Sequence, residues 1–362
     1  MINDKKQIPE EGQVALYGAG MVGVSIYYAI KTLYRNCNIT SFIVSKKEGN
    51  PREIDHTPVV SLEEFSASDV EILVAVPEIH HNAIAAELER RDLKKYICID
   101  SAMEASLMEK YYEKIRCFPS LHSYISGEKS ADIDVYMTRF HRDTPLKNSY
   151  EFPEWIYPIQ AGAALTKEYI ADIGDNTGDN ISEKNVNYSE LSVMYWLGKN
   201  AIKENIPDKY LGMFHYRRIL DIKGEDLYRI EKNGIDIILP YPTVHYPSIN
   251  EHHKRYVKDS DWEAMICALK ELTPEYAEKM PHIFSQPYFY NYNMFVAKSH
   301  IFKEFCDWMF PILRRTEELS SPKGWERADR YIGYLGENLT TLYFMYHKNY
   351  LKIVHTGRIM LI

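Results

Sequence analysis

The sequence has few cysteines, no long apolar run and no excess of positive charge, and each lack excludes a class of protein. Its five cysteines are odd in number and never spaced as Cys-x-x-Cys, so they indicate neither a disulfide framework nor a zinc site. No apolar stretch approaches the roughly 20 residues needed to span a bilayer. A net charge of -8 argues against a general nucleic-acid binder, since duplex binding depends on lysine and arginine neutralising phosphates.

The composition favours a globular protein with a substantial core. The first residues, Met1 to Lys6, lack the apolar core of a signal peptide, so we expect a protein that is made and kept in the cytoplasm. The length of 362 residues suits two domains, and a hydrophobic content of 45% is ordinary for soluble proteins. Tyrosine is abundant, with 29 residues; aromatic faces stack on sugar rings, although most tyrosines simply pack with the hydroxyl at the surface.

A glycine-rich turn near the amino terminus predicts a nucleotide-binding type of fold. Residues 13–17 read as a buried strand, a helix is expected over residues 24–33, and Gly18, Gly20 and Gly23 stand between and at the start of them. This is the G-x-G-x-x-G spacing in its required context of strand, turn and helix. Further strands and helices alternate after it, which is typical of a small doubly wound parallel sheet.

We expect this Rossmann-like domain to cover residues 1–125. Its second strand ends at Ser45, where an NAD site places an acidic residue for the ribose, and no Tyr-x-x-x-Lys pair follows the glycines. A module that binds a nucleotide, or binds nothing and regulates or docks its neighbour, is therefore favoured over an NAD(P)-binding enzyme domain.

A second alternation of strands and helices, expected over residues 126–362, is organised around a polar loop, a helix and a strand. Asn187 can cap the helix together with Glu190. Residues 210–214 have the apolar density of a buried strand, and a His-Tyr-Arg-Arg tip at residues 215–218 stands where this strand leaves the sheet. Because ligands bind at the carboxyl ends of strands in open α/β sheets, we expect the site there.

An ordered set of polar and aromatic motifs runs through this second part. They are Tyr157-Pro-Ile-Gln160 with Gly162, Thr177-Gly-Asp-Asn-Ile-Ser-Glu-Lys-Asn185 with Tyr188 and Glu190, Gly212 with His215-Tyr-Arg-Arg218, Asp236-Ile-Ile-Leu-Pro240, Tyr290-Asn-Tyr-Asn-Met-Phe-Val296, and Arg330 with Gly336-Glu-Asn338. Together they resemble the signature of an uncharacterised family of predicted glycosyltransferases encoded in bacterial capsule and exopolysaccharide loci. The resemblance implies a GT-A-like α/β domain that acts on a nucleotide sugar.

Transferases with the GT-A fold bind the nucleobase of the donor at the end of their first strand. They bind its diphosphate through a divalent metal that an Asp-x-Asp pair holds. Here the first strand leads to Thr138 and His141, which we expect to contact the nucleotide. Where the Asp-x-Asp pair would stand, the sequence has His215, Arg217 and Arg218. Two guanidinium forks can neutralise a diphosphate as a metal would, so we expect a metal-independent site.

The remaining candidates are carboxylates and amides. Transfer to a hydroxyl needs a base on the acceptor or a group that stabilises an oxocarbenium-like centre, and carboxylates can serve either role. The catalytic candidates are Asp175, Asp179 and Glu337, and the sugar-binding candidates are Asn180, Glu190, Asn291 and Asn293, the last two on one face of a strand expected over residues 290–296. Each candidate also has a structural alternative. The loop carboxylates could simply be solvated, Glu337 could favour the helix dipole, and the amides could bond neighbouring backbone. One of the two arginines could form an ion pair with Asp221.

The sequence thus predicts a cytoplasmic glycosyltransferase that moves a sugar from a nucleotide-sugar donor, with UDP as the first choice of nucleotide, to a lipid-linked or oligosaccharide acceptor. It would require no metal or other cofactor, apart from weak binding of NAD(P) or a nucleotide in the first domain. Because such acceptors are often lipid-linked, we expect peripheral contact with the inner face of the cell membrane. The alternatives are an NAD(P)-dependent sugar-nucleotide oxidoreductase, and a non-catalytic scaffold of a polysaccharide assembly complex.

Overall fold

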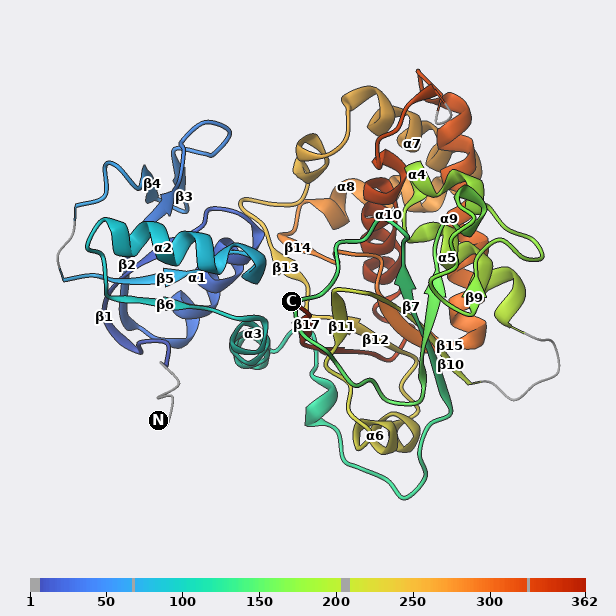
Figure 1. Ribbon diagram of the computed structural model, residues 1–362, viewed down its shortest axis with the longest axis horizontal. Coiled ribbons are helices and arrows are strands. Elements are labelled where there is room, and N and C mark those ends of the chain that lie inside the picture. Colours follow the sequence, from blue (N-terminus) through green and yellow to red (C-terminus); the bar gives the residue numbers. More distant parts are fainter. Residues whose placement is uncertain (1–6, 67–68, 203–208, 324–325) are drawn as a thin grey trace.

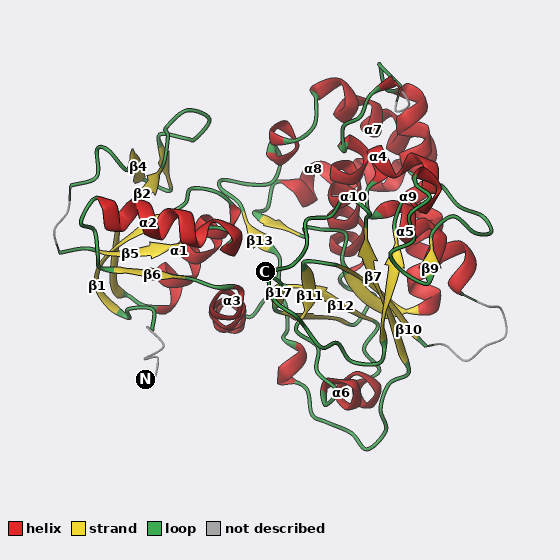
Figure 2. Ribbon diagram, in the orientation of Figure 1, coloured by secondary structure: helices red, strands yellow, loops and turns green. Residues whose placement is uncertain are grey.

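The computed structural model describes residues 7–66, 69–202, 209–323 and 326–362, which form two α/β lobes side by side (Figure 1). The first lobe is built on a six-stranded sheet and the second on a nine-stranded sheet. Figure 2 shows that most of the helix in the molecule belongs to the second lobe. The fold is therefore mixed α/β, as expected.

The first lobe follows the order that the glycine spacing predicts. Its strands are β1 (Glu11–Tyr17), β2 (Asn36–Val44), β3 (Glu53–Ile54), β4 (Thr57–Ser61), β5 (Glu71–Val74) and β6 (Tyr96–Cys98), and its helices are α1 (Met21–Leu33), α2 (His81–Arg90) and α3 (Ser101–Ile115). The sheet order is β3-β4-β2-β1-β5-β6, and only the β3–β4 pairing is antiparallel. Gly18 has a φ of +124°, and a Cβ on Gly23 would lie 2.0 Å from the Gly18 carbonyl oxygen, so turn and helix approach closely only with glycine at both positions.

The second lobe is a larger, mostly parallel sheet. Its strands are β7 (Ile133–Arg139), β8 (Ile156–Gln160), β9 (Ile173–Gly174), β10 (Tyr210–His215), β11 (Arg218–Leu220), β12 (Ile237–Pro240), β13 (Thr243–Val244), β14 (Tyr288–Phe289), β15 (Phe295–Lys298), β16 (Ile353–Thr356) and β17 (Arg358–Met360). The main order is β16-β12-β15-β10-β7-β8-β9, in which β15 runs antiparallel to β10 and β12. Strand β11 pairs with β10 and β17, and β13 pairs with β14.

Helices cover both faces of the second sheet. They are α4 (Asn185–Tyr188), α5 (Leu191–Trp196), a π-helical segment (Leu197–Ala201), α6 (Asp226–Asn233), α7 (Asp259–Leu272), α8 (Pro274–Phe284), α9 (Ser299–Leu319) and α10 (Tyr331–His347), with short 3-10 turns at Glu78–His80, Leu121–Ser123, Ala163–Leu165, Ser182–Lys184 and His252–Arg255 in the two lobes. In β10, Leu211 and Met213 pack with the helices of one face, and Tyr210 and Phe214 pack with α6 on the other. The predicted burial of this strand on both faces is confirmed.

Two local predictions are wrong. The helix expected after an Asn187 cap is interrupted, because Ser189 has a φ of +51° and separates α4 from α5, and Asn187 lies inside α4. Residues 290–296 are not one strand, because a turn separates β14 from β15 and both of its central residues, Tyr292 and Asn293, have positive φ. Left-handed backbone in residues other than glycine is held by tertiary contacts, which local sequence patterns do not reveal.

The two lobes are joined by buried contacts. The Tyr112 hydroxyl of α3 donates to the carbonyl of Pro242 at 2.6 Å. Arg358 of β17 donates to Glu104 of α3 at 3.2 Å. Tyr241 of the second lobe is buried in the apolar core of the first. Part of the core is therefore shared between the lobes.

Candidate functional site

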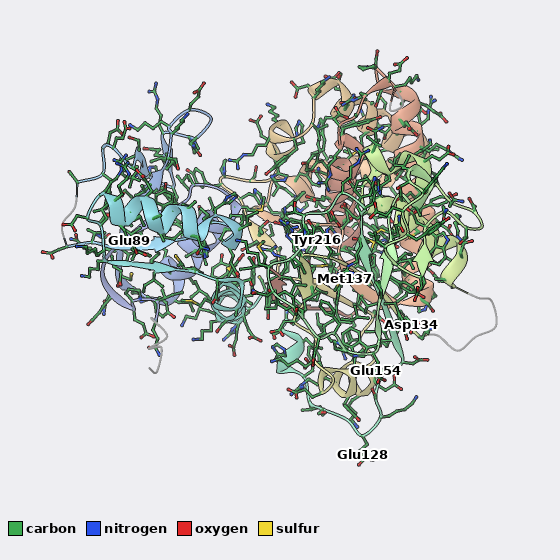
Figure 3. The ribbon with its side chains drawn as sticks, viewed as in Figure 1. Glu89, Glu128, Asp134, Met137, Glu154 and Tyr216 are labelled. Atoms are coloured by element: carbon green, nitrogen blue, oxygen red, sulfur yellow. The ribbon has the colours of Figure 1, made fainter. Side chains whose placement is uncertain are left out.

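The His-Tyr-Arg-Arg tip forms a tight hairpin at the carboxyl end of β10. His215 pairs with Arg218 of β11, which leaves Tyr216 and Arg217 as the two turn residues; Figure 3 labels Tyr216. The NH of Tyr216 donates to the carbonyl of Thr138 at 3.0 Å, so the hairpin is attached to the end of β7. The structure thus places the tip at the expected end of the sheet and fixes it as a turn between two strands.

Both guanidinium groups of the hairpin stack on aromatic rings. Arg217 lies 5.1 Å from the centre of the Tyr216 ring and donates to a main-chain carbonyl at 3.2 Å. Arg218 lies 4.4 Å from the centre of the Tyr292 ring. The Nε atom of each arginine is buried without a hydrogen-bond partner. Neither arginine forms an ion pair with Asp221 or any other residue in the described part of the chain, so both positive charges are free to meet an anionic ligand.

Two carboxylates lie near these arginines. Glu190, which precedes α5, accepts from the amide of Asn293 at 2.9 Å and from Arg330 at 3.4 Å. Burial and the charge of Glu190 raise the pKa of Glu337 in α10 to about 8, while the NH of Tyr292 and the nearby guanidinium groups oppose this rise. A carboxyl group with this pKa can exchange a proton near neutral pH, as a general acid or base does.

These groups form one charged cluster. Its members are His215, Arg218, Glu190, Arg330 and Glu337, and Arg217 adjoins it through Asp143, on which the charges of both Arg217 and Arg330 act. Burial lowers the pKa of His215, which keeps this imidazole neutral near pH 7. The cluster therefore combines free positive charge with a carboxyl group that is protonated more easily than usual.

A turn at Tyr292 and Asn293 holds the carboxylates of the charged cluster in place. Both residues have positive φ, of +74° and +48°. The Asn293 amide is fully buried; it donates to Glu190 and to the carbonyl of Gly333 at 3.1 Å, and it accepts from the hydroxyl of Thr340 at 3.0 Å. Strained backbone of this kind persists only where the surroundings fix it, and it is common at functional sites.

Arg330 and Asp143 belong to this region but were not among the predicted site residues. The Nε of Arg330 donates to the Ser189 hydroxyl at 2.6 Å. Burial raises the pKa of Asp143, although the NH of Phe140 and three arginines, Arg217 among them, oppose this rise. Arg330 could have been found from the sequence, because it precedes Glu337 by seven residues and such spacing places two side chains on one helix face.

The first lobe reaches the charged cluster through α1 and α3. The hydroxyl of Tyr292 lies 3.9 Å from the sulfur of Met21, the first residue of α1. The same tyrosine ring lies 4.8 Å from Arg358, which donates to Glu104. Gly20, which precedes α1, has open space where a Cβ would stand. The edge of the first sheet that carries the predicted nucleotide-binding glycines therefore faces the second lobe.

Asp175 is a buried organiser of loops. It is fully buried and accepts four hydrogen bonds, from the NH groups of Gly162 and Ala163 and from the hydroxyls of Ser182 and Ser192, at 2.5 to 3.0 Å. With its acceptor positions occupied and no exposed surface, this carboxylate is placed to hold the loop and not to contact a substrate.

Asp179 and Asn180 lie away from the charged cluster. Asp179 is exposed and accepts from the hydroxyl of Tyr195 at 2.9 Å, near the carboxyl end of α5, whereas Glu190 precedes the amino end of the same helix. Asn180 donates to the carbonyl of Gly178 at 3.0 Å, within its own loop. The structure therefore does not bring the two loop candidates together with Glu337.

The other predicted residues are at the strand ends. Thr138 is buried and lies opposite His215 in the pairing of β7 with β10. His141 stacks on its neighbouring phenylalanine, and its Nδ1 is buried without a partner. Asn291 is buried and accepts from the hydroxyl of Thr243 at 2.5 Å, a side-chain contact and not the backbone bond of its structural alternative.

Two further features were sought among the described residues: groups of side chains that could hold a metal ion, and helices that could cross a membrane. No three of their His, Cys, Asp and Glu side chains group in a way that could hold a metal ion. Likewise, no helix in the ranges given above is long and apolar enough to cross a membrane.

Comparison with known proteins gives a family and a structural relative. The profile of the family described as a domain of unknown function, DUF4422, matches residues 136–349, which is more than half of the chain. The apo structure of WbbM, a bifunctional glycosyltransferase, is similar with 27% sequence identity and a TM-score of 0.53. The similarity covers 64% of this chain and 45% of that chain, so the present chain corresponds to less than half of WbbM. No curated protein matches.

These matches agree with the resemblance inferred from the motifs at the level of a family related to glycosyltransferases. The family match lies within the second lobe and includes the hairpin, Glu190 and Glu337. The chain belongs to the DUF4422 family.

Proposed function

We propose that the protein is a glycosyltransferase that moves a hexose from a nucleotide sugar, with UDP-sugars as the first choice, to a lipid-linked or oligosaccharide acceptor. One observation carries the proposal: the guanidinium group of Arg218, which forms no ion pair among the described residues, lies near Glu337, and Arg217 precedes it in the same hairpin. Similarity to a bifunctional glycosyltransferase at 27% identity supports it. The proposed setting is synthesis of bacterial capsule, exopolysaccharide or O-antigen.

In this proposal the second lobe is GT-A-like and binds the donor along the ends of β7 and β10. Thr138 and His141 contact the nucleotide, and Arg217 and Arg218 hold the diphosphate. Negative charge grows on the diphosphate as its bond to the sugar breaks, and donors already fixed by the hairpin stabilise that charge. The two guanidinium groups thereby take the part that a divalent metal has in other enzymes.

Glu337 is the proposed base. The hydroxyl oxygen of the acceptor forms a bond to the anomeric carbon, the bond from that carbon to the diphosphate breaks, and the hydroxyl proton passes to the Glu337 carboxylate. Glu190 binds sugar hydroxyls, and the fully buried Asn293 holds Glu190 in place through its amide. We assign supporting roles to Asp175 and Asp179, because neither lies beside Glu337.

The first lobe is proposed to be a Rossmann-like module with weak affinity for NAD(P) or another nucleotide at Gly18, Gly20 and Gly23. Its contact through Met21 with Tyr292, the ring on which Arg218 stacks, favours a regulatory or docking role over independent catalysis. We further propose that the protein works in the cytoplasm and visits the inner face of the membrane to reach a lipid-linked acceptor.

The test is donor hydrolysis by purified protein, measured by mass spectrometry with a panel of UDP-, GDP- and dTDP-sugars. We expect slow release of sugar from one of these donors, with and without EDTA. The Arg217→Met and Glu337→Gln variants should lose this activity, whereas Arg52→Met, at an exposed position of the first lobe, should keep it. Failure of the protein to bind or hydrolyse any donor on the panel would contradict the proposed function.

A further inference from the structure

A pocket lies where α4, α5 and the π-helical segment pack on α9. Its volume is about 220 Å³, and its lining includes three aromatic rings, three cations and one carboxylate: Tyr188, Tyr195, Phe310, Lys184, Lys199, Arg314 and Asp307. None of the charged-cluster residues lines this pocket, although Tyr188 of the lining lies two positions before Glu190. The motif loop of residues 177–185, to which the proposed chemistry gives only a supporting role, borders this pocket through Ile181 and Lys184.

The motif loop is built to hold one side of this pocket. Asp179 accepts from the hydroxyl of Tyr195 at 2.9 Å and, through its carbonyl, from the amide of Asn200 at 2.8 Å. Gly178 has a φ of +58°, and a Cβ there would lie 2.1 Å from the Asn200 side-chain oxygen. Both the positive φ and the close approach of Asn200 favour glycine in this turn, which holds Asp179 against the partly exposed Tyr195.

Two of the three cations around the pocket are paired with carboxylates, and the third is not. Lys184 forms an ion pair with Glu317, and Lys199 forms one with Asp307 at 3.1 Å. Arg314 is exposed and makes no ion pair or hydrogen bond with another residue that the structure describes. A free guanidinium on the rim of a pocket attracts an anion, most strongly a planar carboxylate or a phosphate that matches its fork.

Arg314 also lies close to the aromatic side of the pocket. Burial raises the pKa of Tyr188 and Tyr195, and the positive charge of Arg314 opposes the rise at both hydroxyls. The Tyr195 ring meets Phe310 edge-on at 5.0 Å. The pocket thus offers an apolar aromatic side and a free positive charge within reach of each other.

We propose that this pocket is a second saccharide site, which binds one acidic sugar unit with its carboxylate on Arg314 and its ring against Tyr195. The choice of a saccharide rests on the proposed function, whereas the choice of an anion rests on the free guanidinium. A cavity of about 220 Å³ is smaller than the roughly 300–1,000 Å³ pockets that take drug-sized ligands, so a single ring fits better than a nucleoside diphosphate. Such a site would anchor an acidic acceptor chain away from the charged cluster.

The test is direct binding of trigalacturonate and of neutral maltotriose to the full chain, measured by calorimetry without any donor. We expect trigalacturonate to bind and maltotriose to bind at least about tenfold more weakly, because the carboxylate contact is lost. Arg314→Gln and Tyr195→Ala should each weaken trigalacturonate binding about tenfold or more. The matched control Arg52→Gln, also at an exposed arginine, should leave it unchanged, and Tyr195→Phe tests whether the ring alone suffices.

The possible results separate this site from the proposed chemistry. Trigalacturonate binding that survives Glu337→Gln but falls in Arg314→Gln supports the pocket even if no donor is hydrolysed. Equal binding of both trisaccharides, no binding at millimolar concentration, or full binding by Arg314→Gln would each overturn the inference. A loss of UDP affinity in Arg314→Gln would likewise overturn it, since the pocket would then hold the nucleotide.

Discussion

Glu337→Gln should make the protein more stable and less active, and the structure gives the size of the first effect. Burial and Glu190 raise the pKa of Glu337 from 4.5 to about 8. Below pH 4.5 the side chain is protonated in both the folded and the unfolded chain and has no effect. Between pH 4.5 and 8 only the unfolded chain releases the proton, so folding stability falls as the pH rises. Ionisable Glu337 thereby lowers the free energy of unfolding by roughly 3 kcal/mol at pH 7 and by roughly 4–5 kcal/mol above pH 8.

Thermal unfolding at several pH values measures this effect. Glutamine keeps the size and an acceptor for the NH of Tyr292 but has no charge to bury. We expect the melting temperature of Glu337→Gln to match that of the unmodified protein at pH 4 and to exceed it by several degrees at pH 9. Donor hydrolysis by the unmodified protein should rise with pH to a plateau near pH 8. The Glu337→Gln variant should hydrolyse the donor about a hundredfold or more slowly. Equal melting temperatures at pH 9 would refute the reasoning.

The buried carboxylate, the glycine turn and the first lobe each give a further prediction. Asp175→Asn replaces an acceptor that serves four donors, and should lower the free energy of unfolding by roughly 2–4 kcal/mol in urea titrations; an unchanged midpoint would contradict its organising role. Gly23→Ala should destabilise the first lobe far more than Gly20→Ala, since only the former meets a carbonyl oxygen, at 2.0 Å. NAD should bind more weakly than micromolar in calorimetry, because Ser45 stands where a ribose-binding acid would; tight binding that is lost in Gly20→Trp would reject this.

Patterns confined to one element predicted the fold well. The strand, glycine turn and helix at residues 11–33 follow from spacing and from the space that glycine leaves. The strand before His215 and its tip at the sheet edge follow from an apolar run that ends in charged residues. Such features depend on local sequence and on burial, which a single sequence displays.

Features set by contacts between distant segments were not predictable. Tyr292 and Asn293 read as strand residues, and their left-handed backbone is held by partners such as Glu190 and Thr340. The raised pKa of Glu337 depends on burial and on a carboxylate about 150 positions away in sequence, so the sequence could suggest the residue but not its chemistry. The sequence also could not place Asp179 beside Tyr195, because a loop residue does not reveal toward which end of the next helix it folds.

The most direct test of the account is donor turnover by Arg218→Met in the presence of EDTA. Methionine keeps much of the length of the side chain but removes its charge and its donors. If the hairpin stabilises the departing diphosphate, EDTA should leave the activity of the unmodified protein unchanged. Arg218→Met should lower turnover by about a hundredfold, as expected when a preorganised donor worth about 3 kcal/mol is removed, and Arg218→Lys should restore it only in part. Activity abolished by EDTA and restored by manganese, or full turnover by folded Arg218→Met, would contradict the account.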